Sequence, residues 1–322
     1  MNELHKKFEK NCKEIIDSNL NKLSFDNKIK NINNKVIKLF IENKLINIEE
    51  IFEYSKSRDI DDIIYICPNF DNLKFINNNS ISKDFYKNID FFSYFKSGER
   101  SLNDINSRKE HFRDNERRFL RIQNIIKDKI WLDFGCGYGG LLKIAADIPK
   151  KKIGLEIMEG AKNELIKNNF NIISNLDEIP DESLDVITLS HVFAHLNNPI
   201  SYLNNFYKKL VKGGKLIIET PNCNDALYTT YDSKSFKKFI SAEHLIIHNK
   251  KSLTFLLNYT NFQNIQCENV QRYPLSNHLY WLAFDKPGHQ IEIFDNDQLN
   301  NEYKKILVQN NTTDTLFCIC QK

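Results

Sequence analysis

Short apolar segments alternate with helix-like segments through the middle of the chain, and this alternation constrains the fold most. The apolar segments are KIWLDFG (129–135), KKIGLEI (151–157), FNIIS (170–174), LDVITLS (184–190) and GKLIIET (214–220). Helical patterns separate them at about 139–146, 160–168 and 199–210. Because strands that alternate with helices form a parallel sheet covered on both faces, the sequence predicts an α/β fold. Beyond residue 221 we predict helices at 233–240, 251–259 and 298–308, and two strands (264–273 and 314–321) that finish the sheet in antiparallel fashion.

The N-terminal third has a different pattern. From Leu4 to about Tyr65 apolar residues recur at helical spacing, and glycine is absent before Gly98. We therefore expect an N-terminal helical subdomain over residues 1–106. It ends in an aromatic strap that either closes over a pocket or packs on the next domain, and whose members are Phe85, Tyr86, Phe91, Phe92, Tyr94 and Phe95. A helix at 107–126 should expose Arg113, Arg117, Arg118 and Arg121 to solvent.

Composition excludes few functions but disfavours some. The 45 Lys and Arg residues nearly cancel the 42 Asp and Glu residues, and a net charge of +3 gives no reason to expect nucleic acid as a partner. The seven cysteines form no Cys-x-x-Cys pair, so we expect no metal site and a reduced, cytoplasmic protein. No apolar run reaches the roughly 20 residues that cross a bilayer, and no membrane partner is expected.

A glycine-rich loop follows the first of the central strands. Gly135, Gly137 and Gly140 have the Gly-x-Gly-x-x-Gly spacing that lets a backbone approach a nucleotide cofactor at a helix N-terminus. Glu156 lies about 20 residues further on, where an acidic side chain can accept the hydroxyls of a ribose. These residues predict an adenosine cofactor and leave NAD open as one alternative.

Three segments extend the pattern: LDFGCGYGGLL, LDVITLSHVFAHL and LVKGGKLIIETPN. Together and in this order, over about residues 122–222, they resemble the class I S-adenosylmethionine-dependent methyltransferases, in particular the ubiquinone-methyltransferase-like branch. The resemblance implies a Rossmann-like seven-stranded sheet, mostly parallel with an antiparallel last strand, over residues 107–322 with an insertion at about 274–296. The C-terminal segments are similar to a subgroup of bacterial surface-carbohydrate methyltransferases.

The same resemblance implies S-adenosylmethionine as the cofactor and a set of residues around it. Asp133 would order the glycine loop, Glu156 would accept both ribose hydroxyls, and Ser190 would line the reactive end of the pocket. The complete set of cofactor residues is Asp133, Gly135, Cys136, Gly137, Glu156, Ile157, Asn175, Leu176 and Ser190.

Methyl transfer from a sulfonium is an in-line displacement in which positioning contributes much of the rate. A hydroxyl acceptor also needs a base, and histidine suits neutral pH. His191 and His195 stand four residues apart at the end of a strand, and His244 follows the next strand, so these three are the candidate bases. The alternative for His195 is that it only shapes its loop.

Six residues should reach the same sheet edge and bind the acceptor: Asp225, Tyr228, Arg272, Tyr273, Asn277 and His278. They would suit a polyhydroxylated or phosphate-bearing molecule, although residues 271–282 could equally form packing or a homodimer contact. The predicted function is methyl transfer to a hydroxyl or amine of a small metabolite, a sugar or sugar nucleotide of surface-glycan biosynthesis. An NAD-dependent oxidoreductase, a non-catalytic cofactor-binding scaffold and a nucleic-acid methyltransferase are the alternatives.

Overall fold

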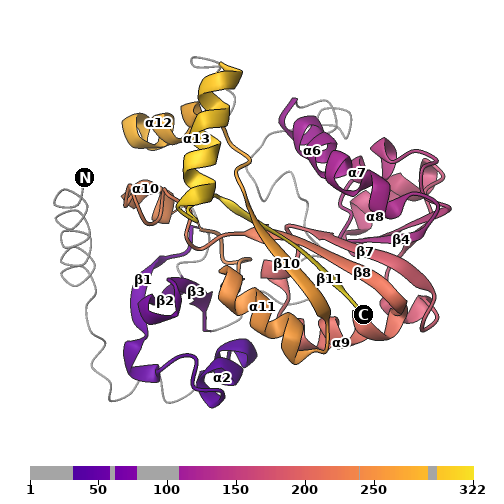
Figure 1. Ribbon diagram of the computed structural model, residues 1–322, viewed down its shortest axis with the longest axis horizontal. Helices are drawn as coiled ribbons and strands as arrows, with labels where there is room; N and C mark the ends of the chain where they lie inside the picture. Colours follow the sequence, from indigo (N-terminus) through magenta and orange to yellow (C-terminus); the bar gives the residue numbers. More distant parts are fainter. Residues whose placement is uncertain (1–31, 59–61, 78–108, 239, 289–295) are drawn as a thin grey trace.

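The computed structural model describes residues 32–58, 62–77, 109–238, 240–288 and 296–322. The main sheet has seven strands in the order β10-β11-β8-β7-β4-β5-β6 (Figure 1). The strands are β4 (Ile130–Phe134), β5 (Lys151–Leu155), β6 (Ile172–Ile173), β7 (Leu184–Ser190), β8 (Leu210–Pro221), β10 (Gln263–Val270) and β11 (Thr315–Gln321). Neighbouring strands from β8 to β6 are parallel, whereas β11 is antiparallel to both of its neighbours. The predicted seven-stranded sheet with an antiparallel last strand is confirmed.

Helices cover both faces of this sheet, as the alternation predicted. In Figure 1, α6, α7 and α8 lie on one side and α9 and α11 on the other. Their bounds are α6 (Lys109–Ile126), α7 (Gly140–Ile144), α8 (Glu159–Lys167), α9 (Pro199–Lys209) and α11 (Lys250–Tyr259). Consecutive strand residues point to opposite faces, so Trp131 packs with the α6 and α7 side while Leu132 packs with the α9 and α11 side. Parallel strands buried on both faces explain the nearly continuous apolar runs.

A second, four-stranded sheet has the order β1-β2-β3-β9 and is antiparallel throughout. It contains β1 (Phe52–Lys56), β2 (Ile63–Cys67), β3 (Leu73–Ile76) and β9 (Ile246–Ile247), and helix α2 (Lys35–Glu42) precedes it. The expectation of a helical N-terminal subdomain holds for α2 but is wrong for the described residues 52–58 and 62–76, which contain three strands. A short apolar run such as IIYIC (63–67) is compatible with either a buried helix or a strand, and its isoleucines and tyrosine favour a strand once partners are present. The aromatic strap lies outside the described residues.

The C-terminal part adds three helices, α10 (Lys234–Lys237), α12 (Leu275–Phe284) and α13 (Asp297–Gln309). Helix α12 lies within the predicted insertion, and α13 matches the predicted helix at 298–308. Within the described ranges, no helix combines the length and the apolar character needed to cross a membrane.

One cysteine pair departs from the expectation of an entirely reduced chain. Cys267 and Cys318 face each other across β10 and β11 and form a disulfide. The remaining cysteines of the described residues are free thiols: Cys67, Cys136, Cys223 and Cys320. No cluster of three or more potential metal ligands occurs in the part of the chain that the structure describes.

Candidate functional site

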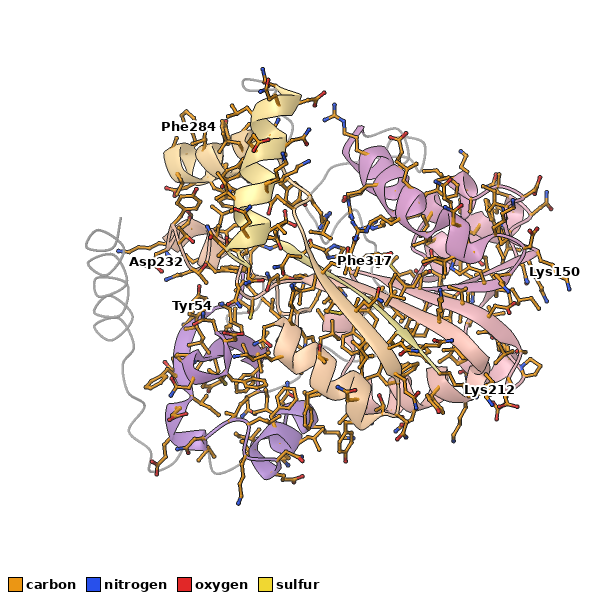
Figure 2. All side chains as sticks on the ribbon, in the orientation of Figure 1. Tyr54, Lys150, Lys212, Asp232, Phe284 and Phe317 are labelled. Carbon is orange, nitrogen blue, oxygen red and sulfur yellow. A yellow bond between two sulfur atoms is a disulfide. The ribbon has the colours of Figure 1, made fainter. Side chains whose placement is uncertain are left out.

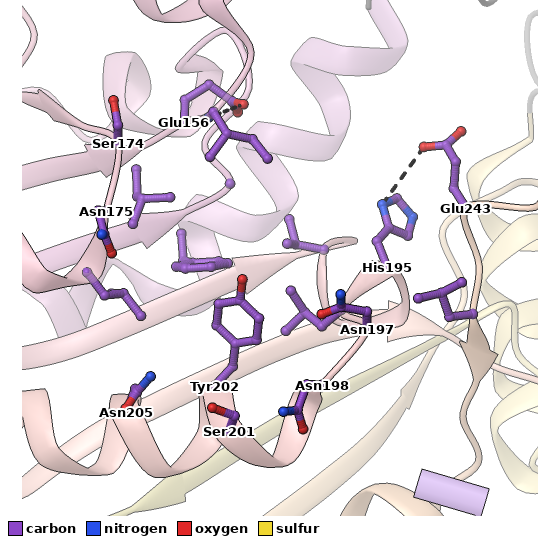
Figure 3. Close-up of a pocket in the computed structure, with 18 of the residues that line it drawn as sticks. Glu156, Ser174, Asn175, His195, Asn197, Asn198, Ser201, Tyr202, Asn205 and Glu243 are labelled. Carbon is purple, nitrogen blue, oxygen red and sulfur yellow. Dashed lines mark hydrogen bonds and ion pairs between the residues drawn. The ribbon is translucent and has the colours of Figure 1, made fainter. Parts of the chain in front are cut away.

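A cavity of about 890 Å³ lies at the carboxyl ends of the central parallel strands. Ligands of open α/β sheets bind at this edge. Its wall combines the loops after β4 (Gly135, Gly137), β5 (Glu156, Ile157, Met158), β6 (Ser174, Asn175, Leu176, Asp177) and β7 (Ser190, His191, Val192, His195, Leu196, Asn197, Asn198). One side of α9 adds Ser201, Tyr202 and Asn205, and Glu243 faces them from another segment (Figure 3). The wall also includes Leu245, Asn33 and Lys35, the first residue of α2.

The glycine loop brings bare backbone to the cavity. Gly135 and Gly137 have φ angles of +71° and +54°, a region that favours glycine. A Cβ atom on Gly135 would lie 2.5 Å from Cγ2 of Val192, so this position also requires a close approach. A Cβ atom on Gly137 would meet no atom within 4 Å, so this backbone faces the cavity and a ligand can approach it. Backbone amides of Gly135 and Cys136 donate to the carbonyl of Leu155, at 2.8 and 3.1 Å, and join the loop to β5.

Glu156 follows β5 and places its buried carboxylate beside the glycine loop. Its Oε2 accepts from the amide of Gly137 at 2.8 Å, and its Oε1 accepts from the amides of Ile157 and Met158 at 2.7 and 2.8 Å. Burial raises the pKa of Glu156 above its ordinary value, and the three donors, which stabilise the ionised form, offset only part of this rise. The carboxylate thus connects the ends of two adjacent strands.

Two of the predicted cofactor residues, Asp133 and Cys136, do not line the cavity. Asp133 is buried in β4 and accepts a 2.7 Å hydrogen bond from the hydroxyl of Thr188 in β7. Burial raises the pKa of Asp133 to about 6. The sulfur of Cys136 points toward β5, since a Cβ atom on Gly154 would lie 2.7 Å from it. Of the predicted cofactor residues, the other seven border the cavity.

His191 lines the cavity with a backbone φ of +55°, which is rare for a non-glycine residue. Its amide donates to the carbonyl of Glu219 at 2.8 Å, which holds this conformation at the end of β7. Its Nε2 lies 2.9 Å from Nη1 of Arg272. Nε2 also lies 3.3 Å from Oε1 of Glu219, so the ring tautomer decides whether this nitrogen accepts from Arg272 or donates to Glu219. Burial and the charge of Arg272 lower the pKa of His191 to about 4, so the ring is neutral at pH 7.

Buried charges surround this histidine. Glu219 of β8 is paired by Arg117 through two bonds of 2.8 and 2.9 Å and by Arg118 at 2.7 Å. Arg272 is paired with Asp114 of α6. Burial raises the pKa of Glu219, but the charge of Arg118 and the hydrogen bonds from Arg117 outweigh it and hold the pKa well below the ordinary value. The prediction that this face of α6 is solvated is wrong for Arg117 and Arg118, because their partner lies about 100 residues away in the sequence.

His195 also lines the cavity, at the end of the short 3₁₀ helix η4 (Phe193–His195). Its Nδ1 lies 3.9 Å from Oε2 of Glu243, across the cavity wall shown in Figure 3. The ring of His244 packs edge-on against that of His195, with centroids 4.9 Å apart, and its Nδ1 shares a 2.9 Å hydrogen bond with the hydroxyl of Ser241. His244 itself is not part of the cavity wall, but its neighbours Glu243 and Leu245 are. Sequence reasoning selected His244 and missed Glu243 beside it.

The six residues expected to bind the acceptor do not line this cavity in the described part of the chain. Asp225 and Asn277 accept from the amides of Leu227 and Gly288 at 2.8 and 2.9 Å. The ring of Tyr228 packs 4.8 Å from Nζ of the buried Lys74, and His278 bonds the hydroxyl of Tyr303.

The last two of the six lie closer to the site but do not reach the cavity. The amides of Arg272 and Tyr273 donate to the carboxylate of Asp314. Of the two, only Arg272 contacts a residue of the cavity wall, His191. These residues make other contacts instead: Asn277 and His278 lie in α12, where His278 faces Tyr303 of α13, and Tyr228 packs against Lys74 of β3.

The structure offers another set of polar groups in their place. Asn197, Asn198, Ser201, Tyr202 and Asn205 line the cavity from the start and one face of α9. Four of them occur at positions i, i+3, i+4 and i+7 of the sequence 198–205, a polar stripe with helical spacing that could have been recognised. Asn33 and Lys35 could not have been recognised in this way, because the sequence does not show that the N-terminal segment reaches this edge of the sheet.

Comparison with known proteins identifies the family. Residues 107–267, half of the chain, match the family model described as a methyltransferase domain. The chain belongs to this methyltransferase family. A probable S-adenosylmethionine-dependent methyltransferase of Mycolicibacterium smegmatis is 26% identical over 132 residues, which cover 39% of this chain and 51% of the relative. A ubiquinone biosynthesis O-methyltransferase of Psychrobacter arcticus is 29% identical over 110 residues, 30% of this chain and 42% of the relative. The chain thus matches about half or less of these curated relatives.

Among solved structures, a SAM-dependent methyltransferase from Archaeoglobus fulgidus shares 21% identity at a TM-score of 0.49, covering 73% of this chain and all of that one. The family membership confirms the prediction of a methyltransferase with S-adenosylmethionine as cofactor and disfavours NAD. The cavity fits this cofactor, since it offers unobstructed backbone at Gly137 and a buried carboxylate at Glu156.

Proposed function

We propose that this protein transfers a methyl group from S-adenosylmethionine to a small molecule. The observation that carries the proposal is the meeting of the Gly135–Gly137 backbone and the Glu156 carboxylate, from two adjacent strand ends, on one cavity. Glu156 would accept the ribose hydroxyls, Asn175 and Leu176 with Ile157 would contact adenine, and Ser190 would lie at the reactive end. Asp133 and Cys136 would act by supporting the loop.

For the acceptor we propose a hydroxyl of a sugar or sugar nucleotide, in the synthesis of surface glycans. The cavity wall formed by Asn33, the start of α9 and its polar stripe carries amides and hydroxyls, which both donate and accept hydrogen bonds as sugar hydroxyls do. Lys35, exposed at the same wall, is the kind of cation that binds a phosphate. We further propose that the enzyme is cytoplasmic, with an accessory part over residues 1–106 and a catalytic domain over residues 107–322. The proposal is compatible with a monomer and with a homodimer.

Calorimetric titration of the full-length protein with S-adenosylhomocysteine and, separately, with NAD tests the cofactor half. We expect binding of the first only, and binding of NAD alone would overturn the proposal. Transfer of radiolabelled methyl from S-adenosylmethionine to a panel of nucleotide sugars, free sugars and small amines tests the acceptor half. Labelling of amines but of no sugar would refute the carbohydrate acceptor while leaving methyl transfer intact.

A further inference from the structure

Three histidines cluster at the reactive end of the cavity, and their surroundings differ. Nε2 of His191 lies 2.9 Å from Nη1 of Arg272 and 3.3 Å from Oε1 of Glu219, so this nitrogen already has charged partners within the protein. His244 does not line the cavity. His195 lines the cavity and has a carboxylate facing its Nδ1 at 3.9 Å. His195 therefore combines access to a ligand with a facing carboxylate that can stabilise its protonated ring.

The segment that carries Glu243 is anchored on both sides. The amide of Leu245 donates to the carbonyl of Ala194, next to His195, at 2.9 Å. The carbonyl of Leu245 accepts from the amide of Ile76 at 3.0 Å and from the side chain of Asn34 at 3.4 Å. The following residues, β9, pair with β3. Glu243 is thus held beside His195 by the N-terminal sheet, from a part of the chain more than 160 residues earlier.

We infer that Glu243 is a positioning residue for His195, which takes the proton of the acceptor hydroxyl. This inference rests on the proposed methyl transfer. A carboxylate facing Nδ1 favours the tautomer that carries its proton there and stabilises the imidazolium that forms. The separation of 3.9 Å is longer than a hydrogen bond, as is common for catalytic pairs before a substrate is bound, and the attraction between charges persists at this distance.

The chemical step balances with these groups alone. The acceptor oxygen forms a bond to the methyl carbon while the carbon–sulfur bond breaks and its electron pair stays on sulfur. The hydroxyl proton passes to Nε2 of His195, and the positive charge that the sulfonium loses appears on the imidazolium beside Glu243. Burial, together with His244 and His191, lowers the pKa of His195, which opposes this charge. Glu243, which faces Nδ1, is the group that would stabilise it.

Histidine NMR of the full-length protein in complex with S-adenosylhomocysteine tests the inference without an acceptor. The His195 signals are assigned with His195→Gln, and ¹⁵N shifts report the tautomer and its titration. We expect the Nδ1-protonated form in the native protein. In Glu243→Gln we expect its share to fall and the pKa of His195 to drop by about one unit, with partial recovery in Glu243→Asp. Glu302→Gln, an exposed site on α13, is the control and should change neither quantity.

Activity gives the second readout. With an acceptor from the panel, we expect Glu243→Gln to lower kcat by about 10- to 100-fold and to shift the pH profile, while affinity for S-adenosylhomocysteine stays unchanged. An unchanged His195 tautomer and titration in Glu243→Gln would overturn the inference, as would full turnover. Absence of S-adenosylhomocysteine binding by the native protein would instead refute the proposed function, so the two failures are distinguishable.

Discussion

At the residue scale, the proposed function makes one carboxylate the main determinant of how tightly an adenosyl group is held. Glu156 accepts from three backbone amides and faces the cavity. In Glu156→Gln, an amide NH₂ replaces one acceptor oxygen, so hydrogen bonds to the loop or to the ribose are lost. We expect affinity for S-adenosylhomocysteine to weaken by about 1–3 kcal/mol in calorimetry. Glu159→Gln, the exposed counterpart on α8, should bind as the native protein does, and equal affinities for all three proteins would show that Glu156 is misassigned.

Asp225 offers a prediction on stability. Burial, with a further contribution from Asp314, raises the pKa of Asp225 to about 8. The folded state therefore binds the Asp225 proton more tightly than the unfolded state, and stability is lost as pH rises from about 4 to about 8. Asn at this position can still accept from the Leu227 amide without ionising. Between pH 5 and pH 8, we expect Asp225→Asn to gain about 3–4 kcal/mol relative to the native protein in urea unfolding.

Other buried carboxyls, such as Asp133, titrate in both proteins, so the difference between the two curves isolates Asp225. Parallel dependence of the native and variant proteins on pH would contradict the raised pKa.

At the element scale, α6 is attached to the sheet by charge as well as by apolar packing. Arg117 and Arg118 both bond the buried Glu219 of β8. Removing the charge of Glu219 leaves two partly buried guanidinium groups without their partner, which is costly. We expect Glu219→Gln to lower the free energy of unfolding by about 3 kcal/mol in urea denaturation. Glu268→Gln removes the charge that pairs with Arg121 at a more exposed site, and we expect it to lower the free energy of unfolding by less than about 1 kcal/mol. Equal losses in the two variants would contradict a structural role for the buried pair.

The sequence predictions succeeded where the structure depends on residues that lie close together in the sequence. The order of strands and helices from 129 to 221 and the roles of Gly137 and Glu156 depend on spacing within about 25 residues, and sequence reasoning placed them on one cavity. The N-terminal strands need β9 as a partner, Arg117 needs Glu219, and Glu243 needs the N-terminal sheet. These contacts join segments 100 or more residues apart, and no periodicity in the sequence reports them.

At the scale of the whole molecule, the N-terminal sheet and the methyltransferase domain share buried side chains. Lys74 of β3 is fully buried, donates to the carbonyl of Cys223 at 2.7 Å and lies between the rings of Tyr54 and Tyr228. Ile64 of β2 belongs to one apolar cluster with Cys223, Ile240 and Ile247. Since both parts bury the same cluster, they should unfold together rather than as separate units.

Ile64→Ala tests this coupling with a reporter far from the substitution. The chain has two tryptophans, and in a Trp281→Phe background Trp131, buried in the centre of the main sheet, is the only one left. A truncated core isoleucine costs about 2–5 kcal/mol, and if the two parts are one cooperative unit the Trp131 transition must move to lower urea by that whole amount. Leu299→Ala, on the exposed side of α13, should leave it in place. If the Trp131 transition does not move in Ile64→Ala, the N-terminal sheet unfolds separately from the main sheet. Its contacts with the segment that carries Glu243 would then be lost while the cofactor cavity stays folded.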